Sequence, residues 1–326
     1  MRAAALDCGT NSVRLLVADV ALDAAGHPGR VIELTREMAI TRLGQGVDRT
    51  GELDPVALAR TMDAVRGYAA TCAELGVPTE AIRFVATSAT RDARNRADFE
   101  QGVRAALGVT PEVISGQEEA ALSFAGAASV LRPHQGAPVL VVDIGGGSSE
   151  FVLGTPARGV LALHSADVGS VRLTERHLHA DPPTEAQVAA ARADVRAALD
   201  EVAAVVPLGQ ARAVIGLAGS VTTLTAHALG LPAYDREAVD GTVLTLEQSH
   251  ASCAAMIRAP RAQREAMGFL HPGRVDVIAA GAIVWDEVLA RVAAETAAAG
   301  HRVTQATTSE HDILDGIVLA AATRLA

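Results

Sequence analysis

The chain opens with two apolar runs separated by a short polar stretch. Residues 3–7 and 13–20 are apolar runs of strand length, and residues 8–12 between them read Cys-Gly-Thr-Asn-Ser. Apolar runs bounded by Gly, Asn and Ser predict strands joined by a tight turn. We therefore expect a β-hairpin at the N-terminus.

A helical period replaces this pattern after residue 54. Asp54 is suited to cap a helix, Pro55 to occupy its first turn, and Gly76 to end it. The apolar positions expected to face the core from this helix are Val56, Leu58, Met62, Val65 and Tyr68.

Two strands that run into polar segments come next. An apolar strand at 82–86 leads into polar residues 87–92, and a short strand at 113–114 precedes a helix beginning at Gly116. In such strand–loop–helix arrangements ligands collect at the carboxyl ends of the strands. The polar residues that follow these strands are therefore candidates for a binding site.

The opening pattern occurs a second time in the chain. Residues 3–20 and 139–153 both read as strand, Asp-x-Gly-x-x-Ser, strand. The aligned pairs are Asp7 with Asp143, Gly9 with Gly145, and Ser12 with Ser148. This internal repeat predicts two similar domains that face one another, each supplying one Gly-rich turn. A linker is expected at 132–138, before the second copy.

The second half of the chain continues the alternation of strands and helices. Thr184 and Gln187 fit a capping box at the start of a long helix, and a strand at 214–215 leads into a small-residue turn at 216–220. Helices are expected from Val221 and over 246–257, 275–299 and 311–325. Alternating strands and helices predict layered α/β domains.

Composition narrows the possible chemistry. All 28 basic residues are arginine, so Schiff-base chemistry, a pyridoxal phosphate lysine and the P-loop lysine are excluded. With 38 acidic residues the net charge is −10, and the arginines are scattered, which argues against a nucleic-acid partner. An anionic ligand must therefore be held locally.

The cysteines and the apolar runs indicate the compartment. Cys8, Cys72 and Cys253 are far apart and form no Cys-x-x-Cys pair, which is typical of a reduced compartment without structural zinc. No apolar stretch reaches about 18 residues, and no signal peptide is recognised. We expect a cytoplasmic protein with no membrane partner.

The two Gly-rich turns are candidate phosphate sites. Backbone N–H groups and hydroxyls of a Gly, Thr, Asn and Ser turn can converge on an anion, which binds phosphate without lysine. One such turn is compatible with an ordinary hairpin. Two matching turns, each led by an Asp, are hard to explain as coincidence, so the pair predicts phosphate binding.

Carboxylates near these turns suggest a metal and a base. Asp143 and Glu150 flank the second turn, where Mg²⁺ would bridge carboxylates and phosphate oxygens. Glu118 and Glu119 begin a predicted helix, where the helix dipole explains one carboxylate. The other could be a general base that deprotonates water, and the spacing leaves the choice open.

Three further features have competing interpretations. Arg91 could clamp a phosphate through two hydrogen bonds or be an ordinary solvated arginine. His177 and His179 would not share a helix face, and no second ligand pair accompanies them, so a metal role is not expected. Cys8 lacks a nearby histidine and is expected to pack at a strand end, not to act as a nucleophile.

Six ordered motifs together carry a resemblance to a known family. They are residues 7–16, 86–93, 114–123, 142–150, 271–278 and 309–316. The chain resembles the exopolyphosphatase and guanosine pentaphosphate phosphatase (Ppx/GppA) family of the actin, sugar kinase and Hsp70 superfamily. The resemblance covers nearly the whole chain.

The resemblance implies an α/β fold of two ribonuclease H-like (actin-like ATPase) domains with a cleft between them. The expected domains are residues 1–124 and 125–326, with the last helix, about 311–326, a candidate to pack back on the first. The implied activity is Mg²⁺-dependent release of terminal orthophosphate from inorganic polyphosphate. The implied assembly is a homodimer.

The resemblance also assigns roles to individual residues. The general base of the family maps to Glu119, and its metal-binding and water-positioning carboxylates map to Asp143 and Glu150. Its phosphate-holding positions map to Thr10, Asn11, Ser12, Arg91, Gly145, Gly146, Gly147 and Ser148. Gly219 and Ser220 are also expected to bind substrate, although Ser220 stands where relatives commonly have Thr.

Alternative functions stay open at this point. Lacking the C-terminal helical extension of longer members, the chain is expected to prefer short polyphosphates. Guanosine pentaphosphate or another nucleotide is an alternative substrate. An actin-like nucleotide-binding assembly protein would use the same paired turns to hold ATP, and a sugar or acetate kinase is a third possibility. ATP binding without orthophosphate release from polyphosphate would favour the assembly protein.

Overall fold

The computed structural model describes residues 1–23, 28–127, 136–155 and 158–324. Contacts within the chain divide it into two compact units. The first comprises Met1–Gly126 and Ile313–Ala326, and the second comprises Ala127–Asp312. The linker expected at 132–138 lies largely outside the described residues.

The first unit is built on a five-stranded sheet in the order β3-β2-β1-β4-β5. Its strands are β1 (Arg2–Cys8), β2 (Ser12–Leu22), β3 (Pro28–Ile40), β4 (Ile82–Ala86) and β5 (Glu112–Val113). Its helices are α1 (Val47–Thr50), α2 (Pro55–Glu74), α3 (Ser88–Asp92), α4 (Arg96–Leu107), α5 (Gly116–Ala127) and α13 (Ile313–Thr323), and Thr79–Ala81 forms a 3₁₀ turn. β2 is antiparallel to both of its neighbours, β1 and β3, whereas β4 and β5 run parallel to β1.

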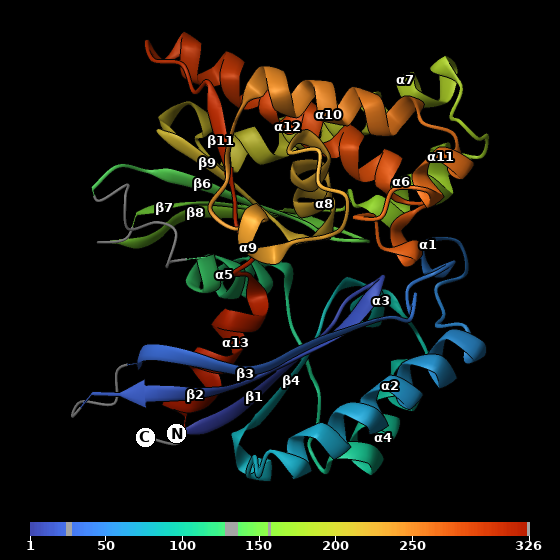
Figure 1. The fold of residues 1–326 in the computed structure, drawn as a ribbon, viewed down its shortest axis with the longest axis vertical. Helices are drawn as coiled ribbons and strands as arrows, with labels where there is room; N and C mark the ends of the chain where they lie inside the picture. The colour runs from blue at the N-terminus through green and yellow to red at the C-terminus, as the bar shows by residue number, and fades with distance from the viewer. Residues whose placement is uncertain (24–27, 128–135, 156–157, 325–326) are drawn as a thin grey trace. The chain divides into compact units, whose positions relative to one another are not determined.

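Helices cover both faces of this sheet (Figure 1). Neighbouring residues of β3 show which helix lies on which face, because successive strand residues point to opposite sides. Arg36 pairs with Asp315 of α13, with 3.0 Å between the guanidinium and the carboxylate. The next residue, Glu37, acts electrostatically on Tyr68 and Cys72 of α2. The last helix therefore packs against the sheet of the first unit, opposite α2.

The second unit repeats this sheet and adds one strand at an edge, in the order β10-β11-β9-β6-β7-β8. Its strands are β6 (Val139–Ile144), β7 (Ser149–Thr155), β8 (Gly159–Ala166), β9 (Ala213–Leu217), β10 (Val243–Thr245) and β11 (Gln305–Thr308). Its helices are α6 (Ser170–His177), α7 (Glu185–Val205), α8 (Ala218–Ala228), α9 (Arg236–Val239), α10 (Leu246–Arg258), α11 (Arg261–Glu265) and α12 (Ile278–Ala298), with 3₁₀ turns at Leu208–Gln210 and Pro272–Arg274.

Both sheets share one topology, which confirms the expected fold class. Three antiparallel strands come first, and the next strands lie parallel to the first of them, as in ribonuclease H-like domains. The predicted repeat is confirmed at the level of register. Asp7 is opposite Arg14 in the β1–β2 pair, and Asp143 is opposite Glu150 in the β6–β7 pair.

Most of the helix-start predictions are confirmed. The Asp54 carboxylate accepts hydrogen bonds from the backbone N–H of Val56 (3.0 Å) and Ala57 (2.9 Å). Thr184 and Gln187 form the expected capping box. The prediction that Val56 faces the core is wrong, because its side chain in the first turn of α2 is 68% exposed and Ala57 is buried instead.

Several element boundaries differ from the sequence-based expectation. The strand expected at 113–114 covers Glu112–Val113. The helix expected from residue 275 begins at Ile278, after a 3₁₀ turn that starts at Pro272. The helix expected from Val221 begins at Ala218, because Ala218 takes a left-handed conformation (φ 66°) that turns the chain sharply from β9 into α8.

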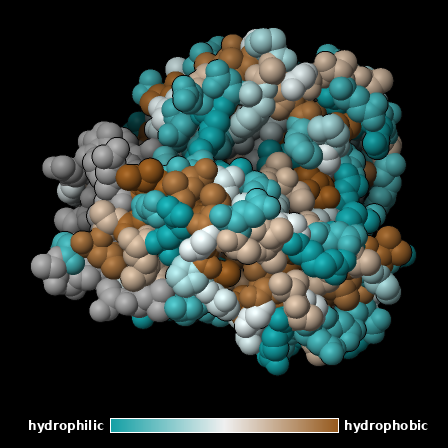
Figure 2. All heavy atoms as spheres, turned by 60° about the horizontal axis from the view of Figure 1, so that its bottom comes forward, coloured by the Kyte–Doolittle hydropathy of each residue, from teal (hydrophilic) through white to brown (hydrophobic). Residues whose placement is uncertain are grey.

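Some large apolar side chains lie on the surface of the described residues. Large apolar side chains that are exposed include Ile32, Leu34 and Met38 of β3, and apolar and polar residues are interspersed on the face shown in Figure 2. Scattered exposed apolar residues are normal for folded proteins. No helix among the described residues combines the length and apolarity that crossing a bilayer requires.

Candidate active site

The first Gly-rich turn, residues 9–12, closes the β1–β2 hairpin. The backbone N–H of Gly9 donates to the carbonyl of Ser12 (2.9 Å). The carbonyls of Thr10 and Asn11 are held by the backbone N–H groups of residues 41, 42 and 44, at 2.9 to 3.1 Å. Gly44 is required there, because a Cβ on it would lie 2.4 Å from the Thr10 side chain. The segment after β3 thus fixes the backbone of the turn.

The second Gly-rich turn, residues 145–148, is fixed in the same way by the segment after β8. The N–H of Gly145 donates to the carbonyl of Ser148 (3.0 Å), as in the first turn. The carbonyl of Gly145 accepts from Ser170 (2.9 Å), that of Gly146 from Val171 (2.8 Å) and Arg172 (3.1 Å). The Gly147 carbonyl accepts from the Arg172 side chain (2.7 Å).

This anchoring decides where the amides of the second turn point. In a trans peptide the N–H is directed opposite to the C=O of the same peptide unit. The carbonyls of residues 145–147 point toward α6 and Arg172, so the N–H groups of residues 146–148 point away from them. Three successive amides aimed to one side form a nest that binds an anion.

Gly169 allows the close approach of this turn to α6. A Cβ at Gly169 would lie 2.5 Å from the Gly146 carbonyl oxygen, and neither backbone can yield without moving the turn. We expect Gly169→Ala to cost about 1–3 kcal/mol through overpacking and to weaken binding of inorganic phosphate on the order of tenfold. Isothermal titration calorimetry with phosphate measures this change.

Gly67→Ala in α2 is the matched control for this prediction. A Cβ at Gly67 meets no atom within 4 Å, so the same added methyl group should leave phosphate affinity unchanged. Unchanged phosphate affinity in Gly169→Ala would contradict the anchoring of the turn by α6.

A chain of contacts joins the first turn to Glu119. The Thr10 hydroxyl lies 2.9 Å from the hydroxyl of Ser88, the first residue of α3. Arg91 belongs to the same short helix, donates to the carbonyl of Ile114 (3.1 Å), and lies 3.5 Å from a carboxylate oxygen of Glu119. The carboxyl ends of β1, β4 and β5 therefore bring together the residues predicted for the first unit.

The structure distinguishes the two adjacent glutamates. The Glu118 side chain is 47% exposed and pairs with Arg83 at 3.0 Å. The Glu119 side chain is only 12% exposed and faces Arg91. Glu118 is therefore engaged by Arg83 of β4, whereas Glu119 lies beside Arg91, which belongs to the same short helix as Ser88, the partner of Thr10.

Buried polar oxygens with unmet hydrogen-bonding capacity gather around the first turn. Asn11 Oδ1, Thr41 Oγ1 and Thr90 Oγ1 are buried and have no hydrogen-bond partner among the described residues. Thr41 follows β3, beside Asn11, and Thr90 precedes Arg91 in α3. Buried polar groups are almost always satisfied, so this cluster indicates a place where ligand or water completes the hydrogen bonds.

Asp143 and Glu150 are the carboxylates of the second turn. They are direct cross-strand partners, 8% and 1% exposed, and Glu150 accepts a hydrogen bond from Ser165 Oγ (2.8 Å). Like charges placed directly opposite on adjacent strands destabilise a sheet, and burial increases that cost. Two buried carboxylates side by side fit a hard divalent cation. Among the described residues, no group of three or more His, Cys, Asp or Glu could hold a metal.

Gly219 and Ser220 occupy the first turn of α8, not a loop before it. Ser220 is buried against α12, since a Cβ at Gly281 would lie 2.3 Å from its hydroxyl oxygen. The same Cβ at Gly281 would lie 3.6 Å from the Ser170 side chain. Ser220 therefore lies near Gly281 together with Ser170, whose backbone N–H donates to the Gly145 carbonyl of the second turn.

Arg274 also lies in this region, although its sequence pattern predicts no role for it. A Cβ at Gly219 would lie 2.1 Å from its guanidinium carbon, so the guanidinium lies directly on the start of α8. Arg274 also acts electrostatically on Tyr234 and Glu310. It belongs to the 271–278 motif, but no spacing in the sequence connects that motif to Gly219.

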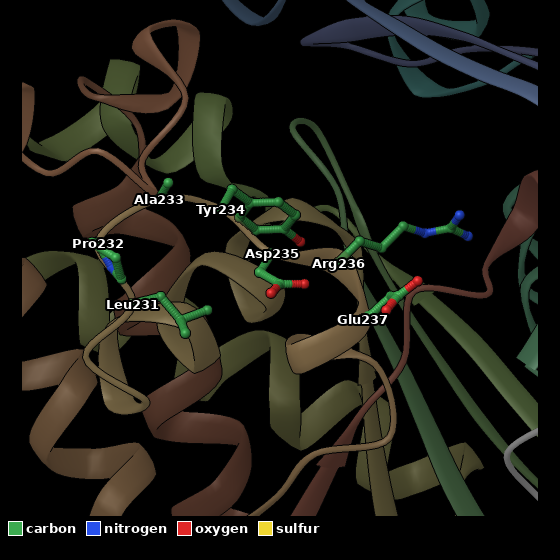
Figure 3. A pocket seen from close by; sticks show the side chains of 7 residues that line it. All are labelled: Leu231, Pro232, Ala233, Tyr234, Asp235, Arg236 and Glu237. Atoms are coloured by element: carbon green, nitrogen blue, oxygen red, sulfur yellow. The ribbon is translucent and has the colours of Figure 1, made fainter.

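Next to Arg274 the second unit contains a pocket of about 520 Å³ lined by residues 231–237 (Figure 3). The Arg236 side chain extends away from the end formed by Leu231 and Pro232. The Tyr234 hydroxyl donates to Glu310, and burial together with the Glu310 charge raises the pKa of Tyr234. Burial also raises the pKa of Glu310.

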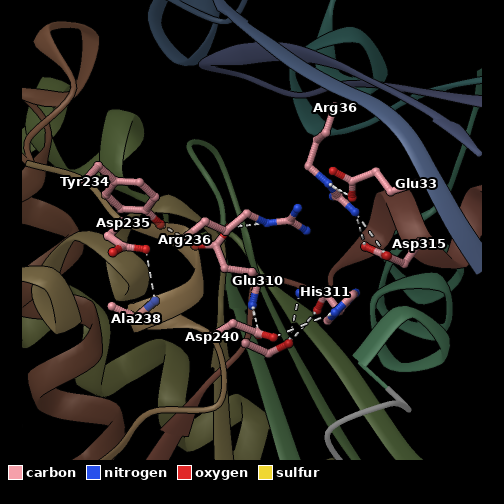
Figure 4. A network of polar contacts seen from close by, with 11 residues as sticks. Glu33, Arg36, Tyr234, Asp235, Arg236, Ala238, Asp240, Glu310, His311 and Asp315 are labelled. Atoms are coloured by element: carbon pink, nitrogen blue, oxygen red, sulfur yellow. Dashed lines mark hydrogen bonds and ion pairs between the residues drawn. The ribbon is translucent and has the colours of Figure 1, made fainter.

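Figure 4 shows the polar contacts around Glu310. Arg236 lies 3.5 Å from the second oxygen of Glu310, and Asp240 accepts from the backbone N–H of Glu310 at 2.9 Å. His311 lies 3.8 Å from Asp240. The same figure shows the separate Glu33, Arg36 and Asp315 contacts of the first unit. The Glu310 carboxylate is thus held by a hydrogen bond from Tyr234 and by an ion pair with Arg236.

The structure places His177 beside a carboxylate and Cys8 in the core. His177 pairs with Asp194 at 3.0 Å. Cys8 is fully buried, and burial raises the pKa of its thiol well above the ordinary value, which disfavours the reactive thiolate.

The whole chain matches known proteins. Residues 20–318 match the Ppx/GppA phosphatase family. Exopolyphosphatase 2 of Mycobacterium tuberculosis is 48% identical over 328 residues, and the alignment covers 98% of each protein. The crystal structure of an exopolyphosphatase-like protein is 46% identical with a TM-score of 0.94 over all of both chains.

A more distant relative has the same fold. The Ppx/GppA protein of Aquifex aeolicus is 28% identical with a TM-score of 0.78, and the match covers 100% of this chain and 98% of the other. The family match over residues 20–318 and the relative at 48% identity agree with each other, and both agree with the two repeated Gly-rich turns. This chain belongs to the Ppx/GppA phosphatase family.

Proposed function

We propose that this protein is an exopolyphosphatase that releases terminal orthophosphate from inorganic polyphosphate in a Mg²⁺-dependent reaction. The observation that carries the proposal is the carbonyl-anchored second turn with its three amides aimed to one side, beside the buried Asp143–Glu150 pair. The relative at 48% identity is named an exopolyphosphatase, and its alignment with this chain covers 98% of both proteins. An anion-binding turn beside a carboxylate pair suited to a cation, and the name of this relative, both support polyphosphate as the substrate class.

Each candidate site residue has a defined part in the proposed reaction. The amides of residues 146–148 hold the terminal phosphoryl group, and the first turn with Arg91 holds and orients phosphate oxygens. Asp143 and Glu150 would hold Mg²⁺, which supplies charge neutralisation at the phosphoryl oxygens. Glu119 accepts a proton from the attacking water. The water oxygen bonds to the terminal phosphorus as the bridging P–O bond breaks, and the leaving group is a chain one phosphate shorter.

Arginines and amides take the place of lysine in this site. The protein has a net charge of −10 and no lysine, yet its proposed substrate is a polyanion. Backbone N–H dipoles, Arg91 and a bound cation would neutralise the phosphate charge locally. A negatively charged protein can therefore bind a polyanion, because a preorganised site does not depend on the net charge of the chain. The position of Arg274 on the start of α8 makes it a further candidate phosphate contact.

The test is orthophosphate release from polyphosphates of graded length, with Mg²⁺ and with EDTA. We expect release with Mg²⁺, loss of release in EDTA, and a preference for short chains. Guanosine pentaphosphate tested on the same preparation would replace polyphosphate in the proposal if its kcat/KM were higher. ATP binding without orthophosphate release from polyphosphate would support an assembly protein instead.

The assembly and compartment are also part of the proposal. We propose a cytoplasmic homodimer. All three cysteines are buried free thiols, as expected in a reducing compartment. Light scattering coupled to size-exclusion chromatography gives the oligomeric state directly.

A further inference from the structure

The two halves of the protein place different charges at equivalent positions. Arg14 in β2 occupies the position that Glu150 occupies in β7, because each is the second residue after the aligned Ser of its turn. The registers agree, since Arg14 is opposite Asp7 and Glu150 is opposite Asp143. The first pair therefore joins opposite charges and the second joins like charges.

The Asp7–Arg14 contact is close and shielded. Arg14 Nη2 lies 2.6 Å and Arg14 Nε 3.0 Å from Asp7 Oδ2, so both donors converge on one carboxylate oxygen. The Asp7 side chain is 7% exposed and that of Arg14 19% exposed. A guanidinium stays charged at every pH at which proteins are folded. The carboxylate of the first turn is thus neutralised permanently by the chain itself.

The same contact disfavours metal binding by the Asp7 carboxylate. The lone pairs of Oδ2 are engaged by two N–H groups, and a fixed positive charge at 2.6 Å repels a second cation from the remaining oxygen. In the second turn the position of Arg14 is taken by the acidic Glu150, which accepts a hydrogen bond from Ser165. The cross-strand pair of the second turn therefore carries two carboxylates, whereas that of the first carries one carboxylate and one guanidinium.

We propose that Arg14 is the resident cation of the first turn and restricts divalent metal binding to one ion per chain, at the second turn. Arg14 is a positioning residue, because it acts through Asp7 and fixes the carboxylate at the end of β1. The metal assignment at Asp143 and Glu150 rests on the proposed function. The role of Arg14 rests on the internal comparison alone.

The experiment counts Mn²⁺ bound to the intact protein by electron paramagnetic resonance, in which the signal of free hydrated Mn²⁺ falls as the ion binds. We expect the unaltered protein to bind one Mn²⁺ per chain. R14E gives the first turn the acidic pair of the second, and we expect it to bind two. R14Q frees Asp7 without adding charge, so we expect a second, at least tenfold weaker site. Circular dichroism verifies that each variant is folded.

The outcomes separate this inference from the proposed function. Two Mn²⁺ per chain in the unaltered protein, or one in folded R14E and R14Q alike, would overturn the role of Arg14. If R14E fails to fold, R14Q alone decides the question. E150Q tests the metal assignment at the second turn, because it should abolish binding of the one Mn²⁺ that the unaltered protein holds. Retention of that ion in E150Q with gain of a second in R14E would reject the metal assignment and leave the role of Arg14 supported.

Discussion

Glu119→Gln is expected to lower kcat for orthophosphate release about 10²-fold or more, with KM changed little. Loss of a positioned general base typically costs 10²- to 10⁴-fold. Gln keeps the size and the hydrogen-bonding shape of the side chain but cannot accept the proton of the attacking water. Arg91, 3.5 Å from the Glu119 carboxylate, stays available to phosphate, so substrate binding should survive. Steady-state phosphate release over a range of polyphosphate concentrations measures both constants.

Glu118→Gln is a matched control one residue away. Glu118 pairs with Arg83, is 47% exposed, and lies in the same helical turn. Without this contact Arg83 keeps its second partner, Glu112, at 2.8 Å, so the buried guanidinium stays paired and kcat should stay within about twofold of the unaltered enzyme. Equal losses in both variants, or near-normal turnover in Glu119→Gln, would reject Glu119 as the base.

The parts of the fold that local patterns determine were predictable. The Asp-x-Gly-x-x-Ser turn between two apolar runs is a local signal, and finding it twice predicted two equivalent hairpins. The structure gives both hairpins the same closing hydrogen bond, from Gly9 to Ser12 and from Gly145 to Ser148. Capping residues such as Asp54 and Thr184 were recognisable for the same reason, since a cap acts within one turn of its helix.

Other elements had no clear local signal. β3 alternates poorly between apolar and polar residues, and the register shift between Val17 and Ala18 leaves Leu34 outside the pairing. A sequence period of two cannot reveal a strand interrupted by a bulge. The left-handed Ala218 is also invisible in the sequence, because glycine is the residue expected at such a turn.

The choice between Glu118 and Glu119 needed long-range contacts. Both residues lie in the first turn of α5, and both are equally favoured there by the helix dipole. The residues that distinguish them are Arg83, at the start of β4, and Arg91, in α3. Arg274 escaped prediction for the same reason, since its contact with Gly219 depends on how α8 and the 3₁₀ turn before α12 meet.

Glu150→Gln is expected to stabilise the metal-free protein while lowering its activity about 10²-fold or more. In the absence of metal, Asp143 and Glu150 are buried like charges on adjacent strands, a pairing that costs about 1 kcal/mol even when exposed. Removing one charge should therefore raise the Tm in EDTA by about 2–4 °C. A residue kept for function at the expense of stability behaves in this way, whereas a structural residue destabilises the fold when it is replaced.

Magnesium provides the second measurement on the same variant. A ligand that binds only the folded state raises its stability in proportion to the logarithm of its concentration, so Mg²⁺ should raise the Tm of the unaltered protein but not that of Glu150→Gln. Ser165→Ala is the control, because it removes the hydrogen bond to Glu150 and leaves both charges in place. This control should keep the Mg²⁺-dependent rise in Tm. A lower Tm for Glu150→Gln in EDTA, with Mg²⁺ stabilisation retained, would contradict a metal-binding role for this pair.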